Sequence, residues 1–164
     1  MHPEPDPIGP SEESVWNYPR PPRLELVTQR LRVVLDGRDV AATMAGFRVL
    51  ETSHPPTYYF PPADLAADLL GPPRKAGICE WKGRAVLFDL DTGSRRIEGA
   101  AWAYPDPTPG FLAIAGYIAF YAGPMDGCFV GGVPVLPQPG GFYGGWITPS
   151  IRGPFKGGPG TMGW

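Results

Sequence analysis

The chain contains two histidines and two cysteines, and these few residues decide which nucleophilic chemistry it can perform. His2 lies in a proline-rich segment, so His54 is the candidate general base. Ser53 precedes it, but neighbouring residues of an extended strand point to opposite faces, which makes this pair a poor catalytic dyad. Cys79 is the better candidate nucleophile, because a nearby cation favours the thiolate and Lys82 follows three residues later. The alternative is that Cys79 is a buried structural cysteine.

A pair of cysteines and a pair of aspartates are the two patterns that could hold a metal ion. Cys79 and Cys128 are far apart in the sequence, unlike the closely spaced ligands of structural zinc sites, so we predict no metal site from them. Asp89 and Asp91 share one face of a predicted strand and could hold Mg²⁺ for nucleotidyl transfer. The favoured interpretation is that Asp91 opens an Asp-Thr-Gly turn and that Asp89 is a solvated strand residue.

Aromatic residues make a ligand pocket the better-supported hypothesis. We predict one long strand over residues 112–121, in which alanines alternate with Tyr117 and Tyr121 on one face. Such a face leaves volume above the small residues and encloses it with amphipathic rings. The predicted ligand-binding residues are Glu51, Tyr58, Tyr59, Trp81, Lys82, Trp102, Tyr117 and Tyr121, with Glu51 and Lys82 as polar anchors. The alternative is that these rings fill the core of a small β protein.

The segments that contain these residues alternate apolar and polar side chains with the period of two that is typical of β-strands. Predicted strands cover residues 31–35, 40–43, 47–53, 57–60, 84–90, 97–104 and 112–121, and residues 128–130 and 133–136 form a last predicted hairpin. One helix is expected over residues 62–70, which start with a proline and end before Gly71-Pro-Pro. Glycine and proline, with 23 residues each, argue against long helices. The sequence therefore predicts a mainly β protein with antiparallel strands.

The two ends of the chain differ in composition from its middle. Residues 1–22 contain seven prolines and predict an extended arm, which Trp16 and Tyr18 would attach to the domain or to a second copy. Residues 137–164 form a tail rich in glycine, proline and aromatic residues, either anchored by its rings or disordered. Residues 23–136 are expected to form a single β domain. A homodimer through the arm or the tail is a further expectation.

Charge and hydropathy exclude several partners. The net charge is −2, so there is no surplus of basic residues to neutralise a nucleic acid. The most apolar stretch, residues 111–122, is shorter than the roughly 20 residues of a membrane-spanning helix. The first residues lack the features of a signal peptide, and two cysteines are too few for a disulfide framework. We therefore expect a cytoplasmic protein with free thiols and no membrane partner.

Five short motifs resemble, in order, those of one known family. They are Trp16–Pro22, Arg48–Tyr59, Cys79–Gly83, Ala101–Pro105 and Gly116–Tyr121. These motifs are similar to those of the domain-of-unknown-function 427 family, and the tail is similar to the C-terminal extension of its actinobacterial members. The resemblance implies a β-tent-like fold, in which two antiparallel sheets meet at an angle, related in shape to methionine sulfoxide reductase B and to the drug-binding domain of cereblon. Those relatives hold zinc with four cysteines, which this chain lacks.

Together these observations predict a small-molecule-binding protein with an aromatic-lined pocket on a β-sheet face and no cofactor. One alternative is a thiol-dependent enzyme in which Cys79 is activated by His54 or Lys82. Another is a metal-dependent, nucleotidyltransferase-like activity through Asp89 and Asp91. A third is a scaffold protein whose tail wraps around a second protomer. The sequence leaves open whether any reaction is catalysed.

Overall fold

The computed structural model describes residues 2–164, and its strands form two four-stranded antiparallel sheets with smaller sheets beside them. The first sheet has the order β12 (Val133–Pro134), β11 (Gly127–Val130), β3 (Leu31–Leu35) and β4 (Arg38–Thr43). The second sheet has the order β10 (Ile118–Phe120), β9 (Arg96–Ala103), β8 (Gly83–Asp91) and β7 (Arg74–Cys79). A three-stranded sheet joins β2 (Arg23–Leu26), β5 (Phe47–Leu50) and β6 (Thr57–Tyr59). The predicted mainly β, antiparallel fold is confirmed.

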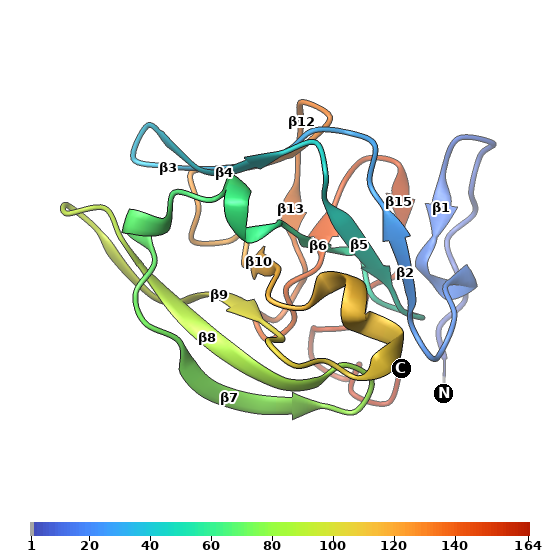
Figure 1. Cartoon of the computed structure of the whole chain (residues 1–164). Helices are drawn as coiled ribbons and strands as arrows, with labels where there is room; N and C mark the ends of the chain where they lie inside the picture. The colour runs from blue at the N-terminus through green and yellow to red at the C-terminus, as the bar shows by residue number, and fades with distance from the viewer. Residues whose placement is uncertain (1) are drawn as a thin grey trace.

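The main hydrophobic core lies between the two four-stranded sheets. In Figure 1, β3 and β4 form the upper layer and β7, β8 and β9 the lower layer. Leu31, Val33 and Leu35 of β3 are fully buried, while the residues between them are partly exposed, as the period of two requires. Phe60 and Phe120 meet edge to face at 5.4 Å within the same core. We call this buried set the inner cluster.

The predicted helix over residues 62–70 is wrong. Two short 3-10 turns replace it, η2 (Pro62–Asp64) and η3 (Ala67–Leu69). Leu65 between them is extended, with φ −109° and ψ 149°, and the backbone N–H of Ala66 donates to the Val40 carbonyl of β4. Pairing with a neighbouring strand therefore outweighs the local helical preference of this segment.

The predicted long strand over residues 112–121 is correct only for β10. The 3-10 helix η4 (Pro109–Ile114) occupies its first part, and Gly116 reverses the chain with φ 75°. Proline at the start of η4 favours the helical turn. None of the helices formed by residues 2–164 is long and apolar enough to cross a membrane.

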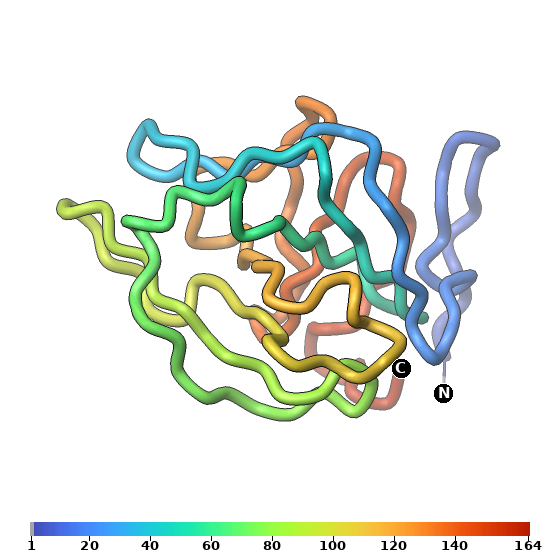
Figure 2. Tube along the Cα trace, viewed as in Figure 1, coloured from blue at the N-terminus to red at the C-terminus, as the bar shows by residue number. Residues whose placement is uncertain are grey.

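The arm and the tail are ordered and pair with each other. In the arm, β1 (Glu13–Ser14) precedes the 3-10 turn η1 (Val15–Asn17) and runs parallel to β15 (Ile151–Arg152) of the tail. Figure 2 shows the blue arm beside the red end of the chain. In the tail, β13 (Leu136–Pro137) pairs with β14 (Trp146–Ile147). Association of two copies through these segments stays a prediction.

Trp146 anchors the tail in the inner cluster. Its side chain is fully buried, and its Nε1–H donates to the Phe120 carbonyl at 2.9 Å. Its backbone N–H donates to the Pro56 carbonyl at 2.8 Å. The sequence left open whether the tail is anchored by its rings or disordered, and the structure shows it anchored.

Candidate functional site

The second sheet has an outer face that points away from the inner cluster, and several predicted site residues lie there. In β8, Val86 and Phe88 pack on the inner cluster, so Leu87 between them points to the outer face. Leu87 pairs with Trp102 of β9, and Trp102 pairs with Ala119 of β10. Directly paired residues share a face, so these three side chains form one row across the sheet.

A buried aromatic cluster covers this outer face. Its buried rings are those of Tyr59, Trp102, Tyr104 and Phe111, and Cys79, Trp81, Tyr117 and Tyr121 pack against them partly buried. Trp102 Nε1–H donates to Tyr59 Oη at 3.3 Å, and the Trp102 ring lies 4.7 Å from the Tyr121 ring. The structure therefore brings together five of the predicted aromatic residues.

Tyr58 is separated from these rings. It precedes Tyr59 on β6, so its side chain points to the other face, into the inner cluster, where its ring lies 5.2 Å from that of Trp146. Tyr58 also lines a different hollow of about 330 Å³, together with Arg48, Glu13 and Glu25.

Lys82 is buried beside the aromatic cluster, with 8% of its surface exposed. Its Nζ lies 5.3 Å from the centre of the Tyr104 ring and 6.0 Å from that of Phe111. Burial by itself lowers the pKa of Lys82, but the neighbouring Tyr59, Cys79 and Glu51 outweigh it, so that the pKa is raised. The side chain is therefore a positively charged ammonium at neutral pH.

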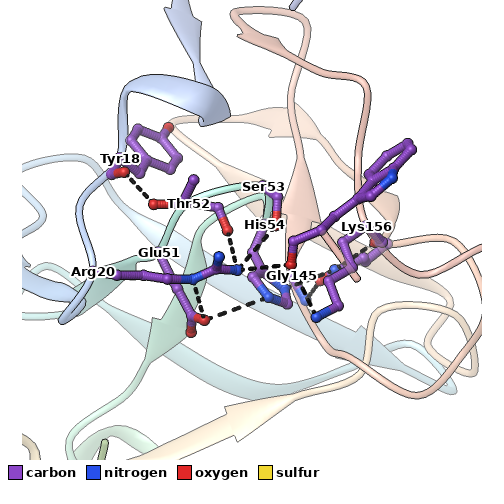
Figure 3. Close-up of polar contacts among 10 residues, drawn as sticks. Tyr18, Arg20, Glu51, Thr52, Ser53, His54, Gly145 and Lys156 are labelled. Carbon is purple, nitrogen blue, oxygen red and sulfur yellow. Dashed lines mark hydrogen bonds and ion pairs between the residues drawn. The ribbon is translucent and has the colours of Figure 1, made fainter. Parts of the chain in front are cut away.

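His54 belongs to a polar network between the arm, β5 and the tail. Arg20 Nε donates to Glu51 Oε2 at 3.3 Å, and His54 Nε2 lies 3.7 Å from the same oxygen (Figure 3). Gln138 Nε2 of the tail lies 3.1 Å from His54 Nδ1. Burial first, and then the charges of Lys156, Arg20 and Lys82, lower the pKa of His54 to about 3. The imidazole is therefore neutral, and it supplies no positive charge for activation of a thiol.

Ser53 is an unsuitable nucleophile. Its side chain is fully buried, and its Oγ accepts a hydrogen bond from the Arg20 guanidinium at 3.3 Å. Its backbone has φ 72°, which turns the chain between β5 and β6. The prediction that Ser53 lies in an extended strand over residues 47–53 is wrong, because β5 ends at Leu50 and Ser53 lies in the turn that follows it.

The tail covers part of the outer face and forms one side of an open hollow there. The hollow has a volume of about 620 Å³. It lies between the sheet, which contributes Leu87, Gly99 and Tyr121, and the tail segment from Pro137 to Gly145. A Cβ at Gly144 would lie 2.1 Å from the Trp102 ring, so only glycine allows the tail to approach so closely. Of the predicted ligand-binding residues, Tyr121 lines this hollow.

Asp89 and Asp91 do not form a metal site. Asp89 accepts hydrogen bonds from Arg74 at 2.5 Å and from Arg96 at 3.0 Å, and these partners, Arg74 first, hold the pKa of its carboxyl well below the usual range. Asp91 accepts from the Gly93 N–H at 2.8 Å, as the predicted turn requires. The expectation that Asp89 is solvated is therefore wrong. Within residues 2–164, no three side chains of His, Cys, Asp or Glu lie together as metal ligands.

Fold and site together define a mainly antiparallel β protein with a buried lysine and an aromatic cluster on one sheet face. Over residues 23–131, the chain matches the model of the family described as Domain of unknown function (DUF427), which carries the label NTP_transf_9. Because the match covers more than half of the chain, this protein belongs to that family. A comparison with curated proteins gave no match. The matched residues include the second sheet and Lys82, whereas the tail that forms one side of the hollow lies outside them.

Some residues of the site were missing from the sequence prediction. Tyr104 follows Trp102 by two positions, just beyond the end of β9, and the period of two could have added it. Phe111 lies just before the predicted strand over residues 112–121, and its place in η4 had no local signal. Gln138 and Gly144 lie in the tail, where only contacts with distant residues give them a role.

Proposed function

We propose that this protein binds a small organic molecule on the outer face of the second sheet, in the hollow beneath the tail. The observation that carries the proposal is the hollow itself. Its volume of about 620 Å³ falls within the roughly 300–1,000 Å³ that is usual for ligand pockets. The residues of this site come from the family-matched domain and from the tail, so a ligand would bind between them.

The lining favours a ligand with a flat, largely apolar body. Tyr121 and Tyr143 supply rings, and Leu87 supplies an aliphatic surface from the sheet. Two exposed glycines of the tail, Gly140 and Gly141, line the hollow, and their backbone N–H and C=O groups can bond a polar substituent. Behind this lining lie Trp102, Tyr59, Trp81 and Tyr117, which support the outer face as a second layer.

A comparison of two neighbouring tail residues tests the proposal. Tyr143 lines the hollow, whereas Phe142 beside it is 74% exposed and is absent from the lining. We expect that a panel of monocyclic and bicyclic aromatic metabolites includes compounds that raise the melting temperature of the wild type. Tyr143→Ala should weaken binding of these compounds at least tenfold by calorimetry. Phe142→Ala, which removes a ring 4.9 Å from that of Tyr143 but no lining side chain, should weaken it much less. A panel without any binder, or equal effects of the two variants, would contradict the proposal.

A thiol-dependent reaction at Cys79 is the second candidate. The observation that favours it is that Lys82 is a charged neighbour of this half-buried cysteine. Iodoacetamide should then label Cys79 of the folded protein faster than free cysteine at neutral pH, and Lys82→Met should remove the difference. A labelling rate of Cys79 no higher than that of free cysteine would exclude a thiol-dependent reaction at Cys79.

A further inference from the structure

Lys82 carries a buried positive charge that has no ion-pair partner in the part of the chain that the structure describes. None of the ion pairs that the structure shows among residues 2–164 includes it. The carboxylate whose charge acts on it is that of Glu51, which is itself paired with Arg20 at 3.3 Å. A buried charge without a paired counter-charge is unfavourable, so an unpaired ammonium at this depth calls for an explanation.

The neighbours of Lys82 compensate for its burial only in part. The faces of Tyr104 and Phe111 attract the ammonium, but aromatic rings carry no net charge. The Cys79 sulfur is a weak hydrogen-bond acceptor. Among residues 2–164, the ammonium therefore has aromatic faces and a sulfur as neighbours but no ion-paired carboxylate.

Positive charges outnumber carboxylates around His54, and Lys82 is one of them. The charges of Lys156, Arg20 and Lys82 all act on His54, and among residues 2–164 the carboxylate that lies within 4 Å of the imidazole is that of Glu51. Figure 3 shows Arg20 and Lys156 on either side of His54. This local excess contrasts with the net charge of −2 of the whole chain. It attracts an anion and disfavours a cation.

Two buried phenols can assist in binding the oxygens of an anion. Burial raises the pKa of both Tyr59 and Tyr104, so their hydroxyls remain protonated and can donate. Tyr59 Oη accepts a hydrogen bond from Trp102 Nε1, and a hydroxyl that accepts a hydrogen bond can still donate its own O–H. Lys82 and the two phenols are thus hydrogen-bond donors from different elements that gather in one place.

We propose that Lys82 is the charge partner of an acid group, a carboxylate or a phosphate ester, on the ligand of this protein. The proposal rests on the proposed function, because the organic part of the same ligand would lie on the outer face. Trp102 connects the two regions, since it bonds to Tyr59 on one side and stacks against Tyr121 of the hollow at 4.7 Å on the other. The ligand class is therefore a small aromatic acid or aromatic phosphate ester.

Four probes with the same ring and different charge test this inference: benzoate, phenyl phosphate, benzamide and benzamidine. In calorimetric titrations at low salt, the wild type should bind at least one of the two anions tenfold or more tightly than benzamide, and benzamidine most weakly. Lys82→Met should lose the preference for the anion but keep the binding of benzamide. Lys82→Arg should restore part of the preference. The matched control is Lys75→Met, which removes an exposed lysine of β7 and should change nothing.

The outcomes separate the two proposals. If benzamide binds as tightly as the anions, or if Lys82→Met keeps the preference, the role of Lys82 is overturned while ligand binding stands. If none of the probes binds, the proposed function fails for this ligand class and the inference fails with it. Should Lys82→Met not fold, the ε-methylene NMR signals of Lys82 in the wild type decide: benzoate or phenyl phosphate should shift them and benzamide should not. The stronger of the two anions identifies which acid group the site takes.

Discussion

Replacement of Trp146 by alanine tests whether the tail is part of the folded core. The indole is fully buried, lies 5.2 Å from Tyr58 and 6.1 Å from Phe60 by ring centres, and bonds to the Phe120 carbonyl. Loss of a buried tryptophan costs about 3–5 kcal/mol. An unsatisfied buried carbonyl adds about 1–3 kcal/mol, although water entering the cavity would recover part of this. We therefore expect the free energy of unfolding to fall by about 4–6 kcal/mol.

Urea denaturation and calorimetry measure this loss. At roughly 2–4 °C per kcal/mol for a protein of this size, the melting temperature should fall by about 10–20 °C. Trp146→Phe, which keeps most of the volume but not the N–H donor, should lose less than Trp146→Ala. The control Phe142→Ala removes an exposed ring of the same tail and should change stability by less than about 0.5 kcal/mol. A loss below about 1 kcal/mol for Trp146→Ala would refute the packing of the tail in the core.

Three further predictions concern a close contact, a pH dependence and a thiol. Gly144→Ala places a Cβ against the Trp102 ring, so the free energy of unfolding should fall by about 1–3 kcal/mol and the melting temperature should drop with it. An unchanged melting temperature would mean that the tail does not pack against Trp102. Burial and then nearby cations lower the pKa of His54 in the folded protein to about 3. As the pH drops below about 6.5, His54 therefore takes up a proton in the unfolded chain but not in the folded protein. The free energy of unfolding should fall between pH 6.5 and 3, by at most about 1.4 kcal/mol per pH unit. In urea titrations between pH 7 and 5, His54→Gln should lack this slope, and a difference from wild type that is constant with pH would disprove the assignment. Burial raises the pKa of the Cys128 thiol to about 12, so peptide mass spectrometry should find iodoacetamide on Cys79 but not on Cys128 of the folded protein; equal labelling would contradict this.

The fold could be predicted where the local pattern and the tertiary contacts agree. Leu31, Val33 and Leu35 alternate in the sequence and are buried in alternation in β3. Residues 112–121 show a similar alternation, yet only Ile118–Phe120 form a strand, because the turn at Gly116 separates η4 from β10. Alternation tells which residues would share a face in a strand, but it does not tell where a strand begins.

The site could be predicted in part for the same reason. Tyr117 and Tyr121 do pack against the same aromatic cluster, because the period of two persists through β10. Tyr58 and Tyr59 are adjacent, so strand geometry alone separates them, and the prediction should have kept only one. The hollow, in contrast, depends on Gly144 meeting Trp102 across a long sequence separation. No local pattern in a glycine-rich tail indicates which distant ring it will touch.

The parallel pairing of β1 with β15 has a consequence for biosynthesis. Glu13 pairs with Ile151, so the arm finds its partner only after nearly the whole chain has left the ribosome. Contacts of such long sequence separation form slowly, because the entropy of closing the loop is lost before the contact is made. Until β15 has been synthesised, the proline-rich arm therefore remains unpaired. Its sequence is poor in residues that favour β-strands, which keeps it from pairing with a wrong strand during this time.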